Sequence, residues 1–210
     1  MGPAQPPRAR RFASRGGEKL DAALDAFNVT VDGARVLDAG ASTGGFTDCL
    51  LQRGAREVIA ADVAYGQLAW ELRNDPRVHV LERTNVRTLM PEQAGPLDLL
   101  VADLSFISLS ALAGVFSSLR PERMVLMVKP QFELPRSSVP KGGVVRDPAA
   151  WIEAMDAVAR AYRGAGYALS GAAPSPLVGP KGNREFFLHF VREGMDVGDD
   201  VIRSATEQAP

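Results

Sequence analysis

The chain has 210 residues, of which 46% are hydrophobic, so it can bury one substantial core and a single main domain is expected. Its formal net charge of −1 at pH 7 excludes binding of a polyelectrolyte through the overall charge of the protein, and its single cysteine, Cys49, excludes an internal disulfide. No apolar run approaches membrane-spanning length and the first twelve residues lack a signal-peptide core, so we expect a cytoplasmic protein that does not bind membranes.

The two ends of the chain differ in charge. Residues 1–13 form a basic, proline-rich head without an acidic residue, which we expect either to be disordered or to contact phosphate groups. Residues 193–210 form an acidic tail, in which a last helix is expected over residues 201–208. The region between them, residues 14–192, is therefore the candidate for the folded domain.

Apolar runs and helical periodicities alternate along this region. The predicted helices cover residues 19–27, 46–52, 66–73, 110–119 and 148–164. The predicted strands cover residues 36–38, 58–63, 78–81, 97–104, 124–128, 167–172 and 185–191. This alternation predicts an α/β fold with a mostly parallel sheet and helices on both faces, and ligands bind such sheets outside the carboxyl ends of the strands.

A glycine-rich turn follows the first predicted strand. Residues 38–47 read DAGASTGGFT and lead directly into the second helix, which suits a nucleotide-like ligand because glycines let backbone N–H groups approach it closely. A dinucleotide fingerprint has a different glycine spacing, and Asp38 at the strand tip would repel a pyrophosphate. The same acid would attract a cationic amino-acid group, so the turn favours S-adenosylmethionine over NAD.

Two of the following strands also end in residues that suit such a ligand. Asp62 ends the second strand, where an acid commonly binds the two hydroxyls of a ribose; alternatively, it caps a helix. Asn85 and Val86 follow the third strand, where they would flank an adenine, although Asn85 is also a common turn residue.

Asp103 and Lys129 end the next two strands and would face the middle of the cleft. Lys129 follows the fully apolar run 124–128, and a lysine at such a place is costly unless it is paired. Partial removal from water would let it act as a base, whereas the alternative is a lysine that extends into solvent. For Asp103 the alternative is a helix cap.

Six segments resemble the TlyA family, also called haemolysin A, of ribosomal RNA 2′-O-methyltransferases within the FtsJ-like group. The similarity runs from about Arg10 to Arg192, with the motifs in order and at fitting spacing. In that family a Lys-Asp-Lys-Glu tetrad surrounds the reacting hydroxyl, and it corresponds here to Lys19, Asp103, Lys129 and Glu185. The matching segments are 14–20 (SRGGEKL), 38–47 (DAGASTGGFT), 61–68 (ADVAYGQL), 101–108 (VADLSFIS), 128–133 (VKPQFE) and 182–187 (GNREFF).

The resemblance implies a Rossmann-like methyltransferase fold over residues 14–192, with a seven-stranded sheet whose last strand is antiparallel. It implies S-adenosylmethionine as cofactor and transfer of its methyl group to a ribose 2′-OH of ribosomal RNA, the family's acceptor being cytidine. No metal is expected, because the only histidines, His79 and His189, are far apart. Expected cofactor contacts are Asp38 near the methionine ammonium, Asp62, Asn85, Val86, Asp103, and the turn residues Gly40, Ser42, Gly44, Gly45 and Phe46.

Basic and aromatic residues near the strand tips are the expected contacts for RNA or a ribosomal subunit. Phe106 would stack on a base, with core packing as the alternative. The basic residues in this set are Arg10, Arg11, Arg15, Lys141, Arg146, Lys181 and Arg184.

The chain departs from the family at its beginning. The family normally carries an N-terminal RNA-binding domain, whereas only about a dozen residues precede Ser14, and residues 10–13 resemble the linker between the two domains. The chain is either a truncated form or a natural short form. In the second case a small-molecule hydroxyl becomes an alternative acceptor, and a non-catalytic S-adenosylmethionine-binding module is a further alternative.

Overall fold

The computed structural model describes residues 11–209, in which seven strands form one sheet with the order β3-β2-β1-β4-β5-β7-β6. Strands β1 to β5 run parallel, whereas β7 pairs antiparallel with both β5 and β6. The fold class expected from the sequence is confirmed, including the antiparallel last strand. The strands are β1 (Arg35–Ala39), β2 (Glu57–Ala61), β3 (Val78–Leu81), β4 (Leu99–Ala102), β5 (Arg123–Val128), β6 (Ala168–Pro174) and β7 (Phe186–Val191).

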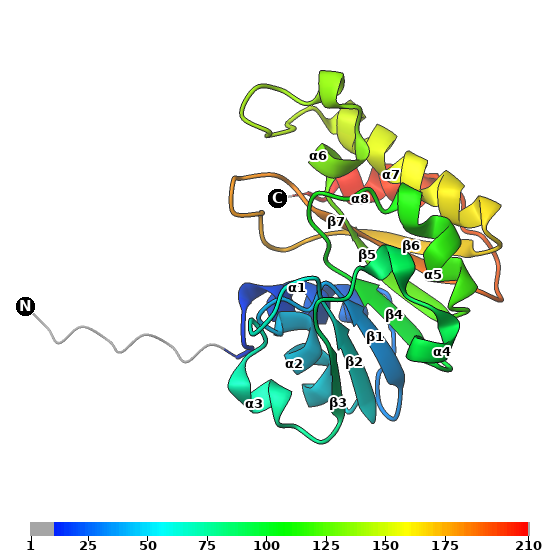
Figure 1. The fold of residues 1–210 in the computed structure, drawn as a ribbon. Helices are drawn as coiled ribbons and strands as arrows, with labels where there is room; N and C mark the ends of the chain where they lie inside the picture. Colours follow the sequence, from blue (N-terminus) through cyan, green and yellow to red (C-terminus); the bar gives the residue numbers. More distant parts are fainter. Residues whose placement is uncertain (1–10, 210) are drawn as a thin grey trace, which may run out of the picture.

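Helices cover both faces of the sheet, so the molecule has three layers (Figure 1). One layer contains α1 (Arg15–Ala26), α2 (Gly45–Gln52) and α3 (Trp70–Arg73). The other contains α4 (Pro91–Ala94), α5 (Ala113–Ser118), α7 (Pro148–Gly164) and α8 (Asp200–Glu207). The short helix α6 (Pro130–Glu133) directly follows β5.

The apolar strands form because both sheet faces are covered. In β1, Val36 packs in the core beneath α1 and α2, while its neighbour Leu37 packs in the core beneath α5 and α7. In β4, Val101 and Ala102 divide between the same two cores. Successive side chains of a strand point to opposite faces, so a strand buried on both sides needs a continuous apolar run.

The order of the strands defines the place for a ligand. From β1 the chain builds outward to β2 and β3, and it then returns to add β4 and β5 on the other side of β1. The carboxyl ends of β1 and β4 therefore flank the point where the order reverses, which is where open α/β sheets form a crevice.

The structure corrects several predicted boundaries. Strand β2 ends at Ala61 and β4 at Ala102, so Asp62 and Asp103 lie just beyond the sheet. The predicted helix over residues 66–73 is wrong in its first half, because Gly66 adopts φ +71° and only α3 (Trp70–Arg73) is helical. The helix predicted from residue 110 begins as the 3₁₀ turn η2 (Ser110–Leu112), and α1 begins earlier than predicted, at Arg15, because Ser14 caps it.

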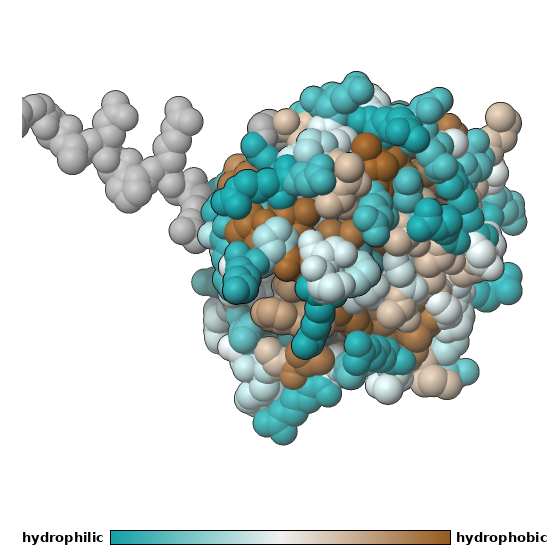
Figure 2. All heavy atoms as spheres, turned by 90° about the horizontal axis from the view of Figure 1, so that it is seen from above, coloured by the Kyte–Doolittle hydropathy of each residue, from teal (hydrophilic) through white to brown (hydrophobic). Residues whose placement is uncertain are grey.

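Seen from above, the surface is mostly hydrophilic, and apolar residues show between hydrophilic ones (Figure 2). Within residues 11–209, no helix combines the length and the apolar character that crossing a bilayer requires.

Candidate active site

The turn after β1 is built for a close approach between two strands. Gly40 adopts φ +91°, and a Cβ added to it would lie 2.6 Å from the carbonyl oxygen of Asp103 beyond β4. Ser42 also has a positive φ, +48°, which is uncommon outside glycine. Its N–H donates to a carboxylate oxygen of Asp62 at 2.8 Å, and the N–H of Ala64 donates to the other oxygen at 2.8 Å. The tip of β2 thus holds the turn in place.

Asp38 lies near the carboxyl end of β1, as expected, and its contact with a methionine ammonium stays a prediction. Its side chain is fully buried beneath the turn, and Oδ2 accepts a hydrogen bond of 2.6 Å from the hydroxyl of Thr47. Burial raises the pKa of Asp38 to about 7; the Thr47 hydrogen bond opposes that shift, whereas the nearby Asp103 and Asp62 charges add to it. A carboxyl in this position supports the turn from below, while its other oxygen, Oδ1, has no hydrogen-bond partner among the described residues.

Two adjoining hollows lie above the glycine turn. The first hollow, about 360 Å³, is lined among others by Gly40, Ser42, Asp62, Val86 and Asp103. The second hollow, about 310 Å³, is lined among others by Gly16, Lys19, Ser42, Gly45, Phe46 and Asp103. Ser42 and Asp103 line both hollows, which therefore lie next to each other, and each has a volume within the range usual for ligand sites, about 300–1,000 Å³.

The residues of these hollows fit a nucleoside joined to a cationic amino-acid chain. Asp62 lies in the first hollow, and a carboxylate still accepts hydrogen bonds from ribose hydroxyls when it already accepts one N–H on each oxygen. Asp103 lies at the junction, where its negative charge favours a cationic centre. The close approach at Gly40 and the carboxylates are therefore compatible with S-adenosylmethionine.

Two expected cofactor contacts, Asn85 and Gly44, are not among the residues that line these two hollows. Asn85 is exposed and caps the 3₁₀ turn η1 (Val86–Thr88), accepting from the N–H of Arg87 at 3.0 Å, which is the turn role that the sequence left open. Gly44 is buried against Leu68 and Leu72 at the start of α2, with φ +97°. It thus allows the turn to pack on α3.

A third hollow, about 370 Å³, lies beside the loop that follows β4, residues 103–109, which we call the Asp103 loop. It is lined among others by Ser105, Phe106, Lys129, Phe132, Lys181, Asn183 and Glu185. It contains Ser105 and Phe106 in common with the first hollow and Pro180 in common with the second. An acceptor in the third hollow would therefore lie next to a cofactor in the other two.

The four residues of the expected tetrad form two ion pairs where the hollows meet. Nζ of Lys129 lies 2.6 Å from Oδ1 of Asp103 and 3.1 Å from the hydroxyl of Ser105. Nζ of Lys19, on α1, pairs with Oε2 of Glu185, and both side chains are more than 90% buried. Lys129 and Glu185 line the third hollow, whereas Lys19 and Asp103 line the second.

Glu185 reaches this place because of the direction of its strand. It directly precedes β7, and an antiparallel strand begins at the edge where its parallel neighbours end. Gly179 leaves room for its carboxylate, since a Cβ added there would lie 2.7 Å from Oε1 of Glu185.

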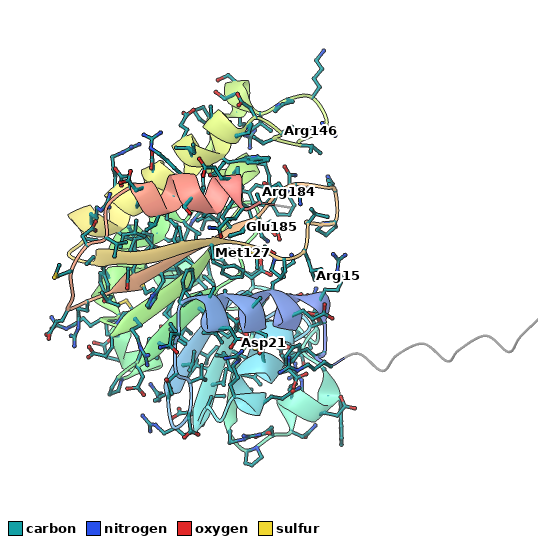
Figure 3. All side chains as sticks on the ribbon, turned by 180° about the vertical axis from the view of Figure 1, so that it is seen from behind. Arg15, Asp21, Met127, Arg146, Arg184 and Glu185 are labelled. Carbon is teal, nitrogen blue, oxygen red and sulfur yellow. The ribbon has the colours of Figure 1, made fainter. Side chains whose placement is uncertain are left out.

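Several of the expected RNA contacts lie around the opening of the site. Arg15 begins α1, lines the second hollow and donates to the carbonyl oxygen of Val178 at 3.2 Å. Arg184 and Arg146 lie on the same side of the molecule as Arg15, on different loops (Figure 3). Lys181 lines the third hollow, and Lys141 is exposed on the loop above it.

Phe106 and Arg11 have different surroundings. Phe106 is 88% exposed and adopts φ +65°, and the centroid of its ring lies 5.1 Å from that of Phe132. An exposed stacking face, as expected from the sequence, is compatible with this position. Arg11 pairs with Asp21 on α1 and lies over the ring of Phe12, which gives it a structural role. Arg10 lies outside the described residues.

Sequence reasoning missed residues whose partners are distant in the chain. Asn183 is buried and joins two loops, accepting from the N–H of Val145 at 2.9 Å and donating to the carbonyl oxygen of Gly143 at 2.8 Å. Ser105 and Glu133 lie within the segments 101–108 and 128–133, and neither is predicted as a site residue. Their fixed places within those motifs were the available signal.

The comparison with known proteins agrees with this geometry. The model of the FtsJ-like methyltransferase family matches residues 12–192. The chain is 56% identical over 212 residues to the 16S/23S rRNA (cytidine-2′-O)-methyltransferase TlyA of Mycobacterium tuberculosis. The aligned region covers 96% of this chain and 78% of that protein. It is 42% identical over 208 residues to YqxC of Bacillus subtilis, with 95% and 74% covered.

A solved structure of a Lactococcus lactis protein superposes with a TM-score of 0.90 at 36% identity, covering 95% of this chain and 99% of that one. The family match spans most of the chain, and the close relatives cover nearly all of it. The chain therefore belongs to the FtsJ-like methyltransferase family, whose methyl donor is S-adenosylmethionine.

Proposed function

We propose that this protein methylates the 2′-hydroxyl of a cytidine in ribosomal RNA. The observation that carries the proposal is the pair of lysine–carboxylate contacts at the junction of the three hollows, with Lys129 and Glu185 facing the third. The name of the Mycobacterium tuberculosis relative supports the choice of ribosomal RNA and of cytidine.

In this proposal Lys129 is the general base. Bound S-adenosylmethionine supplies a methyl group on a sulfonium centre. The acceptor oxygen would take that methyl group, S-adenosylhomocysteine would be the other product, and the hydroxyl proton would pass to Nζ of Lys129. Lys129 must hold a neutral amine at that moment, and Asp103 and Ser105, at 2.6 and 3.1 Å, orient it.

The other pair shapes the opposite side of the acceptor. Glu185 lines the third hollow, and its contact with the buried Lys19 keeps both charges compensated. Alignment of the reacting oxygen and carbon supplies much of the rate, and a positioned base adds about 10²–10⁴-fold.

The first prediction concerns Lys129. We expect Lys129→Ala to lower methyl transfer by about 10²–10⁴-fold, because no amine remains to accept the proton. Lys129→Arg keeps the positive charge but stays protonated, so it is expected to be nearly as inactive. Transfer of labelled methyl groups and calorimetric binding of S-adenosylmethionine are measured on the same samples, and binding is expected to persist in both variants. Near-normal transfer by Lys129→Ala would overturn the assignment.

The acceptor is tested with the unmodified protein. Labelled S-adenosylmethionine is supplied with intact ribosomal subunits, free ribosomal RNA and a nucleoside control. Label that maps to a ribose 2′-oxygen of cytidine supports the proposal. Label in the nucleoside alone would favour a small-molecule hydroxyl, and an absence of label with normal cofactor binding would contradict RNA as the acceptor of this chain.

A further inference from the structure

Glu133, at the end of α6, makes a set of hydrogen bonds that the proposed mechanism does not use. Oε1 accepts from the N–H of Leu109 at 2.6 Å. Oε2 accepts from the hydroxyl of Ser108 at 2.8 Å, and from the hydroxyl and the N–H of Ser110 at 3.0 and 3.3 Å. One carboxylate on the chain after β5 therefore holds the chain after β4.

The charge of Glu133 is suited to this place. Its partners lie at the start of η2, which continues into α5, so the carboxylate faces free N–H groups at a helical N-terminus. Among residues 11–209, no lysine, arginine or histidine lies within ion-pair distance of it. The N–H and hydroxyl dipoles thus compensate the charge, and hydrogen bonds to an ionised acceptor are stronger than neutral ones.

These bonds are the last of three contacts between the same two segments, residues 103–110 and residues 129–133. At the site itself, Lys129 contacts Asp103 and Ser105. In the middle, the rings of Phe106 and Phe132 are 5.1 Å apart. Because the single turn of α6 separates Lys129 from Glu133, the distal bonds set how the Asp103 loop lies against Lys129.

We propose that Glu133 is a positioning residue for methyl transfer: it fixes the loop that carries Asp103 and Phe106 relative to Lys129. It lies outside the linings of the three hollows and acts through those residues. The effect on catalysis rests on the proposed function, whereas the effect on the loop does not.

The kinetic test uses Glu133→Ala and Glu133→Gln. Misplacement of reacting groups by about 1 Å costs about 100-fold, so we expect kcat to fall roughly 100-fold in the alanine variant and about 10-fold in the glutamine variant, which keeps one acceptor oxygen. The KM for S-adenosylmethionine is expected to change less than about threefold, because the glycine turn and Asp62, which supply most of the expected cofactor contacts, lie outside the loop that Glu133 holds. A fall in kcat of less than about threefold in Glu133→Ala, or an equal rise in KM, would overturn the proposal.

Asp147→Ala is the matched control. Asp147 also caps a helix, accepting from the N–H of Ala149 at 2.9 Å at the start of α7, but its hydrogen bond stays within its own segment. We expect its loss to lower stability without lowering kcat. If both variants lose the same stability and the same activity, Glu133 has only a structural role.

Hydrogen exchange tests, without any substrate, whether the hydrogen bonds of Glu133 hold the loop. In Glu133→Ala, the amides of Leu109 and Ser110 are expected to exchange at least about tenfold faster, while the amides of β4 and β5 stay protected. Unchanged exchange would overturn the proposal. If the unmodified protein transfers no methyl group, the proposed function fails, and the exchange experiment still decides whether Glu133 holds the loop.

Discussion

At the scale of single residues, the site uses neighbouring carboxylates in opposite surroundings. Asp62 borders the first hollow, whereas Asp38 is enclosed below the turn with one oxygen on Thr47 and with Oδ1 unpartnered among the described residues. Burial favours the neutral form of such a group, so the pKa of Asp38 rises to about 7. The sequence motif alone does not distinguish these two environments.

A pH-dependent stability follows for Asp38. Between its ordinary pKa of 3.8 and its folded pKa of about 7, the folded protein binds a proton that the unfolded chain releases. The free energy of unfolding of the unmodified protein is therefore expected to fall, relative to Asp38→Asn, as pH rises from 4 to 7. Urea unfolding of both proteins at several pH values in this window measures the difference, and parallel curves would contradict the prediction.

The comparison between variants is necessary because of His189. Burial, reinforced by the charge of Arg123, lowers the pKa of His189 to about 4, so the unfolded chain binds the extra proton between about pH 4 and 6.5. That group makes stability rise with pH in the same window. Asp38→Asn leaves this contribution unchanged, so it cancels in the difference.

At the scale of elements, two glycines bring α1 onto α2. A Cβ on Gly17 would lie 2.8 Å from the carbonyl oxygen of Gly45 and would collide with Phe12, and a Cβ on Gly45 would collide with Ser14. The helices therefore meet through their backbones. This contact places Lys19 and the start of α1 beside the glycine turn, where they line the second hollow.

We expect Gly17→Ala to lower the free energy of unfolding by about 1–3 kcal/mol, as overpacking does, and to weaken binding of S-adenosylmethionine. Gly114→Ala in α5 is the matched control, since nothing lies within 4 Å of its added Cβ. A helical glycine with free space is expected to gain about 0.4–1 kcal/mol on this change. Equal effects of the two substitutions, measured by urea unfolding and calorimetry, would contradict the importance of the α1–α2 contact.

Much of this element pattern could be predicted. Parallel strands buried on both faces, such as β1, β4 and β5, produce apolar runs, and all seven strands are predicted with shifts of a few residues at their ends. Helices of one turn, such as α4 and α6, were missed because four residues show no periodicity. At the strand tips, Asp62, Asp103 and Lys129 follow from position, whereas nothing in the local sequence of Lys19 or Glu133 reveals partners more than twenty residues away.

At the scale of the whole molecule, charge is distributed unevenly around a net charge of −1. Arg15, Arg146 and Arg184 lie on the side where the hollows open, on α1 and two separate loops (Figure 3). Long-range attraction of an anion by the protein as a whole is weak at this net charge. The proposed binding to ribosomal RNA therefore depends on the local cations.

The salt dependence of RNA affinity tests whether these local cations contact the phosphates. Binding of a ribosomal RNA fragment is expected to weaken as salt rises, with a slope near −0.7 for each phosphate contacted by a cation. Lys181→Ala removes one such cation, so the slope is expected to become shallower by about 0.7. Arg56→Ala, at the opposite edge of the sheet just before β2, is the control and should leave it unchanged. A slope that Lys181→Ala and Arg56→Ala alter equally would contradict recognition at the mouth of the site.

The antiparallel course of β7 also governs when the site comes into existence. Glu185 follows Lys19 by 166 residues, and ribosomes add about 5–20 residues each second, so the buried ammonium has no partner for roughly 10–30 s of synthesis. Until then Lys19 has to remain in water, and the second hollow lacks its wall at Pro180. In the proposed mechanism the site is therefore complete only when β7 docks, and we expect a chain that ends before Glu185 to transfer no methyl group.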